Sequence, residues 1–249
     1  MKKLFLLFTM LGVVTFLHGK EKIDPMKLSA ADFLKIVRHV PGQETWAKME
    51  GSASHKREGA RRIKAPIRLG IRFTPARIVA QMVFDSKEFY DLGQSFDPPV
   101  STQDMRVPEG HKPKLPLYGI DISDLTLGFL YQDLVREEKP QSVKTLSCRV
   151  FVLKGAKDGE VARVFISTDY FFPMKVQWYR ADPGGNVEGT PWRALEIASV
   201  KKAPDSDFYL IPKLEISGPD WSTMINFDKR FAGYAKDGMP EDLFLFPED

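Results

Sequence analysis

Apolar and polar residues alternate with a period of two between Arg62 and Asp85. Every odd position from Ile63 to Phe73 is apolar, and the alternation resumes at Ile78 after a short polar break. Successive side chains of a strand point to opposite faces, so this pattern predicts a long antiparallel hairpin with one apolar face. We expect Arg68 and Arg72 to face water, and the following residues to face the interior: Ile67, Leu69, Ile71, Phe73, Met82 and Phe84. A second layer of protein or a ligand must cover that apolar face.

Most of the remaining chain also has the composition of strands separated by turns. A strand is expected from Glu44 to Arg57, and the aromatic residues from Phe89 to Phe96 continue the pattern. Further strands are expected at 144–154, 161–168, 174–180, 193–201, 207–216 and 222–230. A total of about nine to eleven strands predicts a mainly β fold, in which one strongly curved antiparallel sheet forms an incomplete β-barrel.

Two short helices are expected over the concave mouth of this sheet, with room for a third. Ser29 and Asp32 resemble a capping box before the helically spaced residues 33–37. Asp121 and Asp124 can cap a second helix, which runs to Tyr131 and is unusually apolar. Five prolines make residues 98–116 a predicted surface loop, which is either a functional lid or an irregular crossing. The apolar tail 243–246 is expected to be docked on the protein.

The first residues have the layout of a secretory signal peptide. Lys2 and Lys3 precede an apolar run from Leu4 to Leu17, so we expect residues 1–19 to be removed on export. Their removal lowers the formal net charge of +3 by two, and a nearly neutral surface argues against nucleic acid as a partner. Basic residues at 56–62 are interpreted as a solvated face. An exported chain whose single cysteine is Cys148 has no internal disulfide, and Cys148 is expected to be buried and inert.

Residue patterns typical of catalysis or metal binding are missing from the sequence. His39, His55 and His111 lie far apart and without a metal-binding spacing. The sequence contains no nucleophile elbow, P-loop or dinucleotide turn. Helix capping accounts for the pair Asp121 and Asp124 better than an acid and base do. We therefore expect no enzyme activity, no catalytic residue, no metal and no cofactor.

Several segments, in their order along the chain, resemble the LolA-like outer-membrane lipoprotein-sorting protein family. Residues 124–131, D-L-T-L-G-F-L-Y, are similar to the D-L-x-x-x-F-L-aromatic helix of that family, and residues 147–153 to its next strand. The hairpin 164–176, the turn at Asp182 and the segments 210–216, 221–227 and 242–244 follow the family's order. The resemblance implies a curved, incomplete barrel whose mouth is plugged by helices and whose cavity accepts the acyl chains of lipoproteins crossing the periplasm.

The resemblance and the residue patterns together predict an exported, unanchored periplasmic carrier formed by a single domain, residues 20–249. Its ligand would be lipoprotein acyl chains or another lipid, with envelope proteins as further partners and at most peripheral or transient membrane contact. Besides the six hairpin residues, Leu125, Phe129 and Leu130 of the second helix are the expected ligand contacts. An envelope-assembly scaffold without a ligand, or a secreted enzyme on the same fold, remains the alternative. An apolar cavity or a filled one would distinguish them.

Overall fold

In the part of the chain that the structure describes, twelve strands form one antiparallel sheet, and the first and last strands pair near its centre. The computed structural model describes residues 24–38, 44–96, 99–155, 158–181, 189–204, 206 and 208–246. The expected signal peptide at 1–19 lies outside these residues. The order across the sheet is β5-β4-β3-β2-β1-β12-β11-β10-β9-β8-β7-β6, and no pairing among the described residues joins β5 to β6. The predicted mainly β half-barrel is therefore confirmed, with one strand more than the expected range.

The two halves of the sheet extend from the central pair β1–β12. The first half consists of β1 (Thr45–Arg57), β2 (Ile63–Phe73), β3 (Arg77–Phe84), β4 (Glu88–Phe96) and β5 (Pro99–Arg106). The second half consists of β6 (Leu134–Val143), β7 (Leu146–Lys154), β8 (Glu160–Ser167), β9 (Pro173–Arg180), β10 (Arg193–Lys202), β11 (Tyr209–Ser217) and β12 (Trp221–Tyr234). Each half is a meander, so every neighbour in space except β1–β12 is also a neighbour in sequence.

The predicted β2–β3 hairpin is present with the expected face inward. Leu69 lies opposite Met82, and Ile67 lies opposite Phe84. All six predicted inward residues are at most 3% exposed, because they belong to the main hydrophobic core. The period of two therefore identified the dry face of the hairpin correctly.

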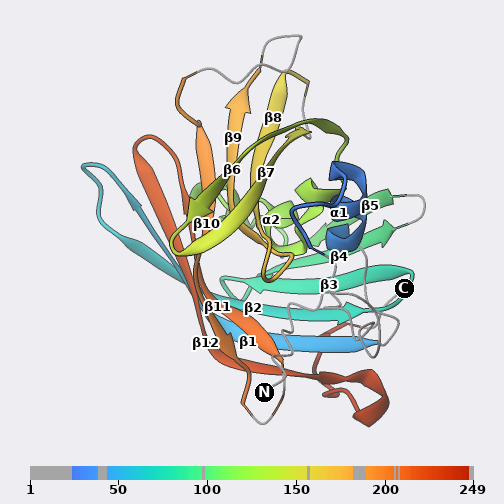
Figure 1. Cartoon of the computed structure of the whole chain (residues 1–249). Coiled ribbons are helices and arrows are strands. Elements are labelled where there is room, and N and C mark those ends of the chain that lie inside the picture. Colours follow the sequence, from blue (N-terminus) through green and yellow to red (C-terminus); the bar gives the residue numbers. More distant parts are fainter. Residues whose placement is uncertain are drawn as a thin grey trace.

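Short helical segments lie on the concave face because the chain must travel from one edge strand to the other. The connection between β5 and β6 contains η1 (Leu115–Tyr118), α2 (Ile122–Thr126) and η2 (Gly128–Tyr131). Together with α1 (Ala30–Arg38), it occupies the hollow between the two halves of the sheet (Figure 1). We call α1 and residues 115–131 the cover. Ser29 caps α1 through the Asp32 N–H, as expected, whereas the second predicted helix is divided at Leu127, whose φ is 54°.

The C-terminal tail crosses the convex face. Contrary to the sequence prediction, Arg68 and Arg72 therefore do not simply face water. Leu243 is buried, so the tail is docked as predicted. Asp242 lies 3.7 Å from Arg68, whose side chain is only 15% exposed, while Arg72 pairs with Glu44. Gly70 permits this contact, since a Cβ there would lie 2.1 Å from the Leu243 carbonyl oxygen. Beyond η3 (Ala235–Asp237), the chain thus adds a layer outside the sheet.

Both edge strands differ from the sequence expectation. Residues 99–106 were expected to belong to a loop but form β5, and β6 was not anticipated at all. An edge strand needs only one neighbour and one row of hydrogen bonds, so it tolerates polar residues and proline. Pro140 lies in β6 where its pairing with β7 shifts register, between Glu138 and Gln141. The expectation of irregular structure does hold for the residues between β5 and η1.

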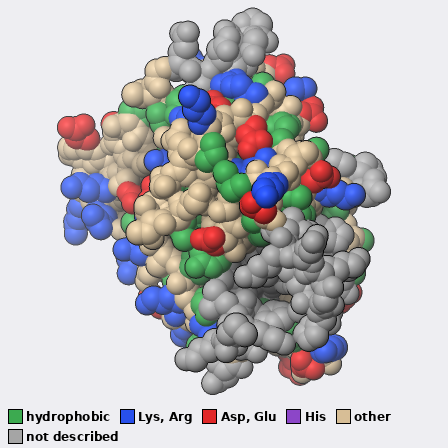
Figure 2. Space-filling model, in the orientation of Figure 1, with side chains coloured by type: hydrophobic (Ala, Val, Ile, Leu, Met, Phe, Trp, Pro, Cys, Tyr) green, Lys and Arg blue, Asp and Glu red, His purple; other side chains and the backbone are tan. Residues whose placement is uncertain are grey.

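The surface charges follow the expected distribution. Figure 2 shows Lys and Arg side chains gathered on the projecting tip of the β1–β2 hairpin. These residues are Lys56, Arg57, Arg61 and Arg62, and all four are exposed. Arg57 pairs with Asp220 on the adjacent turn, at 3.4 Å. The basic cluster is therefore a solvated face of the hairpin tip, as the sequence indicated.

Candidate functional site

The nine predicted ligand contacts come together at the boundary between the sheet and the cover. Leu125 is 7% exposed, Phe129 5% and Leu130 3%, and all three belong to the same core cluster as the six hairpin residues. The ring of Phe129 meets that of Trp178 edge to face, with centroids 5.9 Å apart. In this structure the cover itself occupies the position at which a ligand would meet the concave face.

A buried ion pair fastens α2 to β10. Arg193 donates to both carboxylate oxygens of Asp124 and to the carbonyl oxygen of Gly119. Its guanidinium also lies 4.4 Å from the centroid of the Trp178 ring. Burial raises the pKa of Asp124, while the charge of Arg193 opposes that shift. Asp124 does accept the expected capping bond, from the N–H of Asp121, but its main partner is Arg193.

A second arginine joins the two parts of the cover to each other. Arg38, the last residue of α1, donates from Nε to the carbonyl oxygen of Leu130 at 2.6 Å. It also donates from Nη2 to the carbonyl oxygen of Gln132 at 2.7 Å. These are carbonyls at the end of η2 that no helix continues to satisfy. Arg38 thereby links the end of α1 to the end of η2 through hydrogen bonds.

A third arginine holds the segment that leads into α1. Arg149, on the concave face of β7, forms a bidentate pair with Glu137 at 2.7 Å for both bonds. It donates as well to the carbonyl oxygens of Pro25 and Leu28, each at 2.9 Å. Its guanidinium lies 4.6 Å from the ring centroid of Phe33. The side chain is 3% exposed, so these partners replace the water it would otherwise bind.

On the other side of the hollow, the carboxylate of Glu88 holds the start of η1. It accepts hydrogen bonds from the Lys114 N–H, the Leu115 N–H and the Tyr90 hydroxyl, and His111 Nε2 lies 3.0 Å away. Burial acts to raise the pKa of Glu88, but these hydrogen bonds outweigh it and lower the pKa below its ordinary value. The cover is therefore attached at each end by buried charged groups, as well as by apolar contacts.

Sequence reasoning found the apolar contacts and missed these charged attachments. Isolated arginines form no motif, but two of them do leave a signal in strand alternation. Arg149 shares a face with Phe151 and Leu153, and Arg193 shares one with Leu195. A charge at an inward position of an otherwise apolar strand face marks a buried partner.

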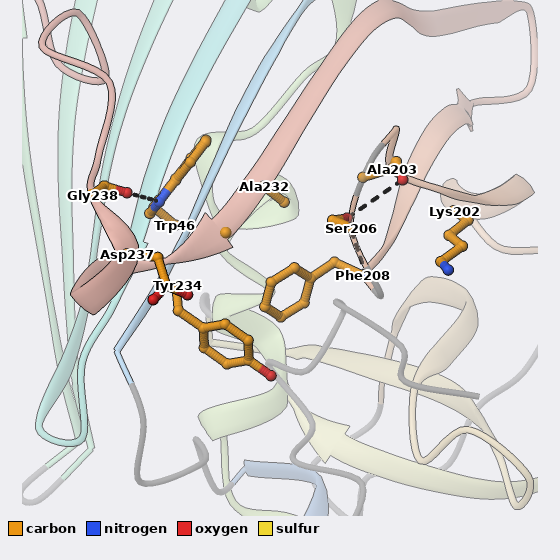
Figure 3. Close-up of a pocket in the computed structure, with 10 residues that line it drawn as sticks. Trp46, Lys202, Ala203, Ser206, Phe208, Ala232, Tyr234, Asp237 and Gly238 are labelled. Carbon is orange, nitrogen blue, oxygen red and sulfur yellow. Dashed lines mark hydrogen bonds between the residues drawn. The ribbon is translucent and has the colours of Figure 1, made fainter. Parts of the chain in front are cut away.

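Two cavities lie where β10 and β11 run together beyond their outer neighbours. One, of about 570 Å³, is lined by Trp46, Tyr234 and Gly238 on one side and by Lys202, Ser206 and Phe208 on the other. Figure 3 shows the rings of Phe208 and Tyr234 side by side, and they are tilted by 57° with centroids 4.8 Å apart. Trp46 donates from Nε1 to the Gly238 carbonyl oxygen, and Ser206 accepts from the Phe208 N–H. The other cavity lies on the opposite side of the same two strands.

The convex face carries two further cavities beside the C-terminal tail. They border Phe246 and Leu245, respectively, and of the nine predicted contacts only Ile67 lines one of them. Cys148 is buried, as expected, and burial raises the pKa of its thiol. No group of three acidic, His or Cys side chains that could hold a metal ion occurs among the described residues. Within the same residues, no helix has the length and apolarity needed to cross a membrane.

Comparison with known proteins gives matches at the level of structure. No family model and no curated protein matches the sequence. A DUF1329 family protein from Desulfovibrio piger superposes with a TM-score of 0.63 at 12% identity, over 88% of this chain and 96% of that one. A domain from Vibrio parahaemolyticus named for outer membrane lipoprotein sorting has a TM-score of 0.58 at 14% identity, over 85% and 93% of the two chains.

The open half-barrel, the helical cover on its concave face and these likenesses define a LolA-like fold. The fold expected from the order of the sequence motifs is confirmed. At these levels of identity the likeness establishes the architecture, and the ligand must be argued from the chain's own residues.

Proposed function

We propose that the protein is exported to the periplasm, loses residues 1–19, and works as a single domain that carries acyl chains of lipoproteins or another apolar ligand. One observation supports this most strongly. The apolar face of the β2–β3 hairpin is covered by short segments that charged side chains fasten in place, where a second sheet would make a permanent core. A layer of this kind can move as a unit and be replaced by a hydrocarbon chain.

Covering the concave face with the cover and covering it with a hydrocarbon ligand should contribute similar free energies. Burying one large apolar side chain is worth about 1.5–3 kcal/mol, so an uncovered concave face is unfavourable without a ligand. A hydrocarbon chain gains about 0.8 kcal/mol per methylene, and about twelve carbons would thus contribute roughly 10 kcal/mol. That is comparable to the contacts of Leu125, Phe129, Leu130 and their neighbours in the cover. The empty protein would therefore be closed, and a ligand would shift it towards an open form.

The attachments of the cover suit such an exchange. Each of Arg38 and Arg193 binds backbone carbonyls, whose oxygens water can satisfy after opening. An arginine released from these carbonyls also keeps its charge and can meet the polar end of a ligand at the mouth. Contact with a membrane would be peripheral or transient, and nucleic acid is not a proposed partner.

A ligand-free scaffold is the second candidate, and the same burial supports it. All nine proposed contacts are at most 7% exposed, so the concave face is full as it stands. The two proposals differ in one respect. The carrier needs the cover to separate from the sheet, and the scaffold does not.

Cross-linking the cover to the sheet tests this difference. The rings of Tyr131 in η2 and Phe96 in β4 stack with centroids 5.7 Å apart. Both would be replaced by cysteine in a Cys148→Ser background and joined with a short bis-thiol reagent. The mature protein, isolated from its producing cells, would be analysed by native mass spectrometry for bound lipid. We expect lipid on the unlinked protein, and loss of fluorescent fatty-acid binding to the concave face after linking.

The matched control links two strands and leaves the cover free. Glu50 and Lys229 lie opposite each other on β1 and β12, so cysteines there can be joined in the same way. This variant should keep its lipid. Equal binding by both linked proteins, at a site on the concave face, would favour the scaffold.

A further inference from the structure

The β10–β11 hairpin leaves the sheet before it ends. Pairing of β10 with β9 covers only Arg193 to Glu196, whereas β10 continues to Lys202. On the other side, pairing of β11 with β12 begins only at Lys213. Among the described residues, 197–202 of β10 therefore pair only with β11, and 209–212 of β11 pair only with β10. We call them the arm.

The sequence explains why the ladder stops at these positions. β9 begins at Pro173, which has no N–H. At that position β9 therefore has no backbone donor for a hydrogen bond to the arm. Pro212 is the arm residue next to Lys213, and it likewise cannot donate towards β12. The register of β10 shifts twice, between Ile197 and Ser199 and between Ser199 and Lys201. Bulges of this kind turn a strand away from its neighbour.

A lysine bridges the gap between β7 and the arm. Lys144, in the β6–β7 turn with φ 55°, donates from Nζ to the carbonyl oxygens of Ile197 and Ala198, at 2.7 and 3.2 Å. Both acceptors lie just beyond the last residue that pairs with β9. An ammonium has three donors, and two are used here. Glu196 is at 3.6 Å, an ion pair longer than a normal hydrogen bond.

The gap holds a cavity of about 340 Å³ with a mainly apolar lining. Phe172, Met174 and Ile197 form its buried part, with Leu146 and Val200 nearer the surface. This volume is at the lower end of the range for ligand sites. Lys144 is the one charged residue that lines the cavity, and the nearby Glu196 carboxylate is shared between Lys144 and Lys175, so this group of charges is net positive.

We propose that this cavity binds a single-chain anionic amphiphile, with its hydrocarbon chain against Met174 and its anionic head at Lys144. A narrow apolar cavity suits one chain, and a positive rim selects an anionic head over a cationic one. The Lys144 side chain is 44% exposed, so the head reaches it from solvent. The site is open while the cover is closed, and it is therefore independent of the proposed carrier site.

The probe is decanoate, a ten-carbon carboxylate, used below its micelle concentration. Binding would be measured by calorimetry and by the NMR shifts of ¹³C-methyl methionine. We expect saturable binding that shifts the methyl signal of Met174 and leaves that of Met82, beneath the cover, in place. A shift at Met82 with none at Met174, or no saturable binding up to 1 mM (about 4 kcal/mol), would overturn the proposal.

Two variants separate the roles of chain and head. Val200→Trp fills the cavity and should abolish decanoate binding. Lys144→Gln should weaken decanoate at least about tenfold, as expected for one hydrogen bond to a charged group, with less effect on the neutral decyl glucoside. Lys154→Gln, an exposed lysine at the other end of β7, should change neither. Equal losses for both ligands in Lys144→Gln would show that the head is not at Lys144.

The cross-linked cover variant distinguishes this proposal from the carrier function. With Tyr131 tied to Phe96, decanoate should still shift Met174. If the carrier proposal fails and this shift remains, the cavity at the arm stands by itself. If linking removes the Met174 shift, the cavity is part of the concave site and the proposal is wrong.

Discussion

Arg193 on β10 and Asp124 on α2 form a bidentate ion pair across the hollow of the half-barrel, and both side chains are buried. The pair joins the long connection between the two edge strands to the middle of the second half of the sheet. At this pair a charge on the cover meets an opposite charge on the sheet.

Removing the cation from this pair should be strongly destabilising. Arg193→Met leaves the Asp124 carboxylate buried without its cation, and such a change costs about 3–5 kcal/mol. The free energy of unfolding from urea titrations measures the loss. Arg193→Met with Asp124→Leu should recover much of it, because the unpaired charge is gone.

The exposed pair of Lys154 and Asp133 provides the control, since both side chains are more than half exposed. Lys154→Met should cost less than about 1 kcal/mol. Without Arg193, Asp124 would bind a proton more readily in the folded than in the unfolded protein. Arg193→Met should therefore regain stability relative to the parent as the pH falls from 7 towards 5. A loss no larger than that of Lys154→Met would contradict the assigned role.

The hairpin face gives a second prediction. Leu69 is 1% exposed and lies opposite both Met49 and Met82, so Leu69→Asp places a charge in the core without a partner. We expect loss of several kcal/mol or failure to fold. Ile63→Asp in the same strand, at a position 43% exposed, should be tolerated. Circular dichroism and urea midpoints would show whether each variant folds and how stable it is. A folded Leu69→Asp protein that still binds lipid would contradict the assignment of Leu69 to the inward face of β2.

Glu88 should make the free energy of unfolding depend on pH. Its pKa is lowered in the folded protein, so it contributes stability above its unfolded pKa, and that contribution is lost as the pH falls through the folded pKa. We expect the urea midpoint to fall steadily below about pH 4.5. Glu88→Gln should be less stable at pH 7 and show a shallower fall. Glu109→Gln, at an exposed position, should follow the parent curve. Parallel curves for Glu88→Gln and the parent would contradict the prediction.

The core of this fold was predictable because alternation encodes it. The inward residues of β2 and β3 repeat every second position, and this repeat alone identifies which face of the strands is buried. The edge strands were not predictable in this way. β6 reads L-V-R-E-E-K-P-Q-S-V, and only its pairing with β7 makes it a strand.

The cover and its attachments were predictable only in part. The apolar residues near Phe129 indicated a segment that must be buried. The bonds from Arg38 to Leu130, from Arg149 to Pro25 and from Arg193 to Asp124 each join residues more than sixty positions apart. Carbonyl acceptors leave no trace in the sequence, since every residue has one. The gap beside the arm depends on where two ladders stop, and Pro173 and Pro212 were its only signals.

The mobility of the cover provides the most direct check on the proposed function. A cover that opens should exchange its amide hydrogens faster than the β2–β3 hairpin, because local opening needs less free energy than global unfolding. Arg38→Met removes two hydrogen bonds from a charged donor to the carbonyls of Leu130 and Gln132. With each such bond worth about 1.5–3 kcal/mol, exchange in residues 128–132 should rise at least about tenfold. Exchange in residues 63–84 should not change.

Arg57→Met, at an exposed position on the hairpin tip, serves as the control and should leave both segments as they were. A bound fatty-acid chain should act in the same direction as Arg38→Met, by speeding exchange in residues 122–131 while leaving the hairpin protected. Mass spectrometry of peptic fragments, with and without ligand, reads all these rates in one experiment. Equal protection of cover and hairpin in every sample would mean that the cover is a permanent part of the core, and the scaffold would then be the better account of this protein.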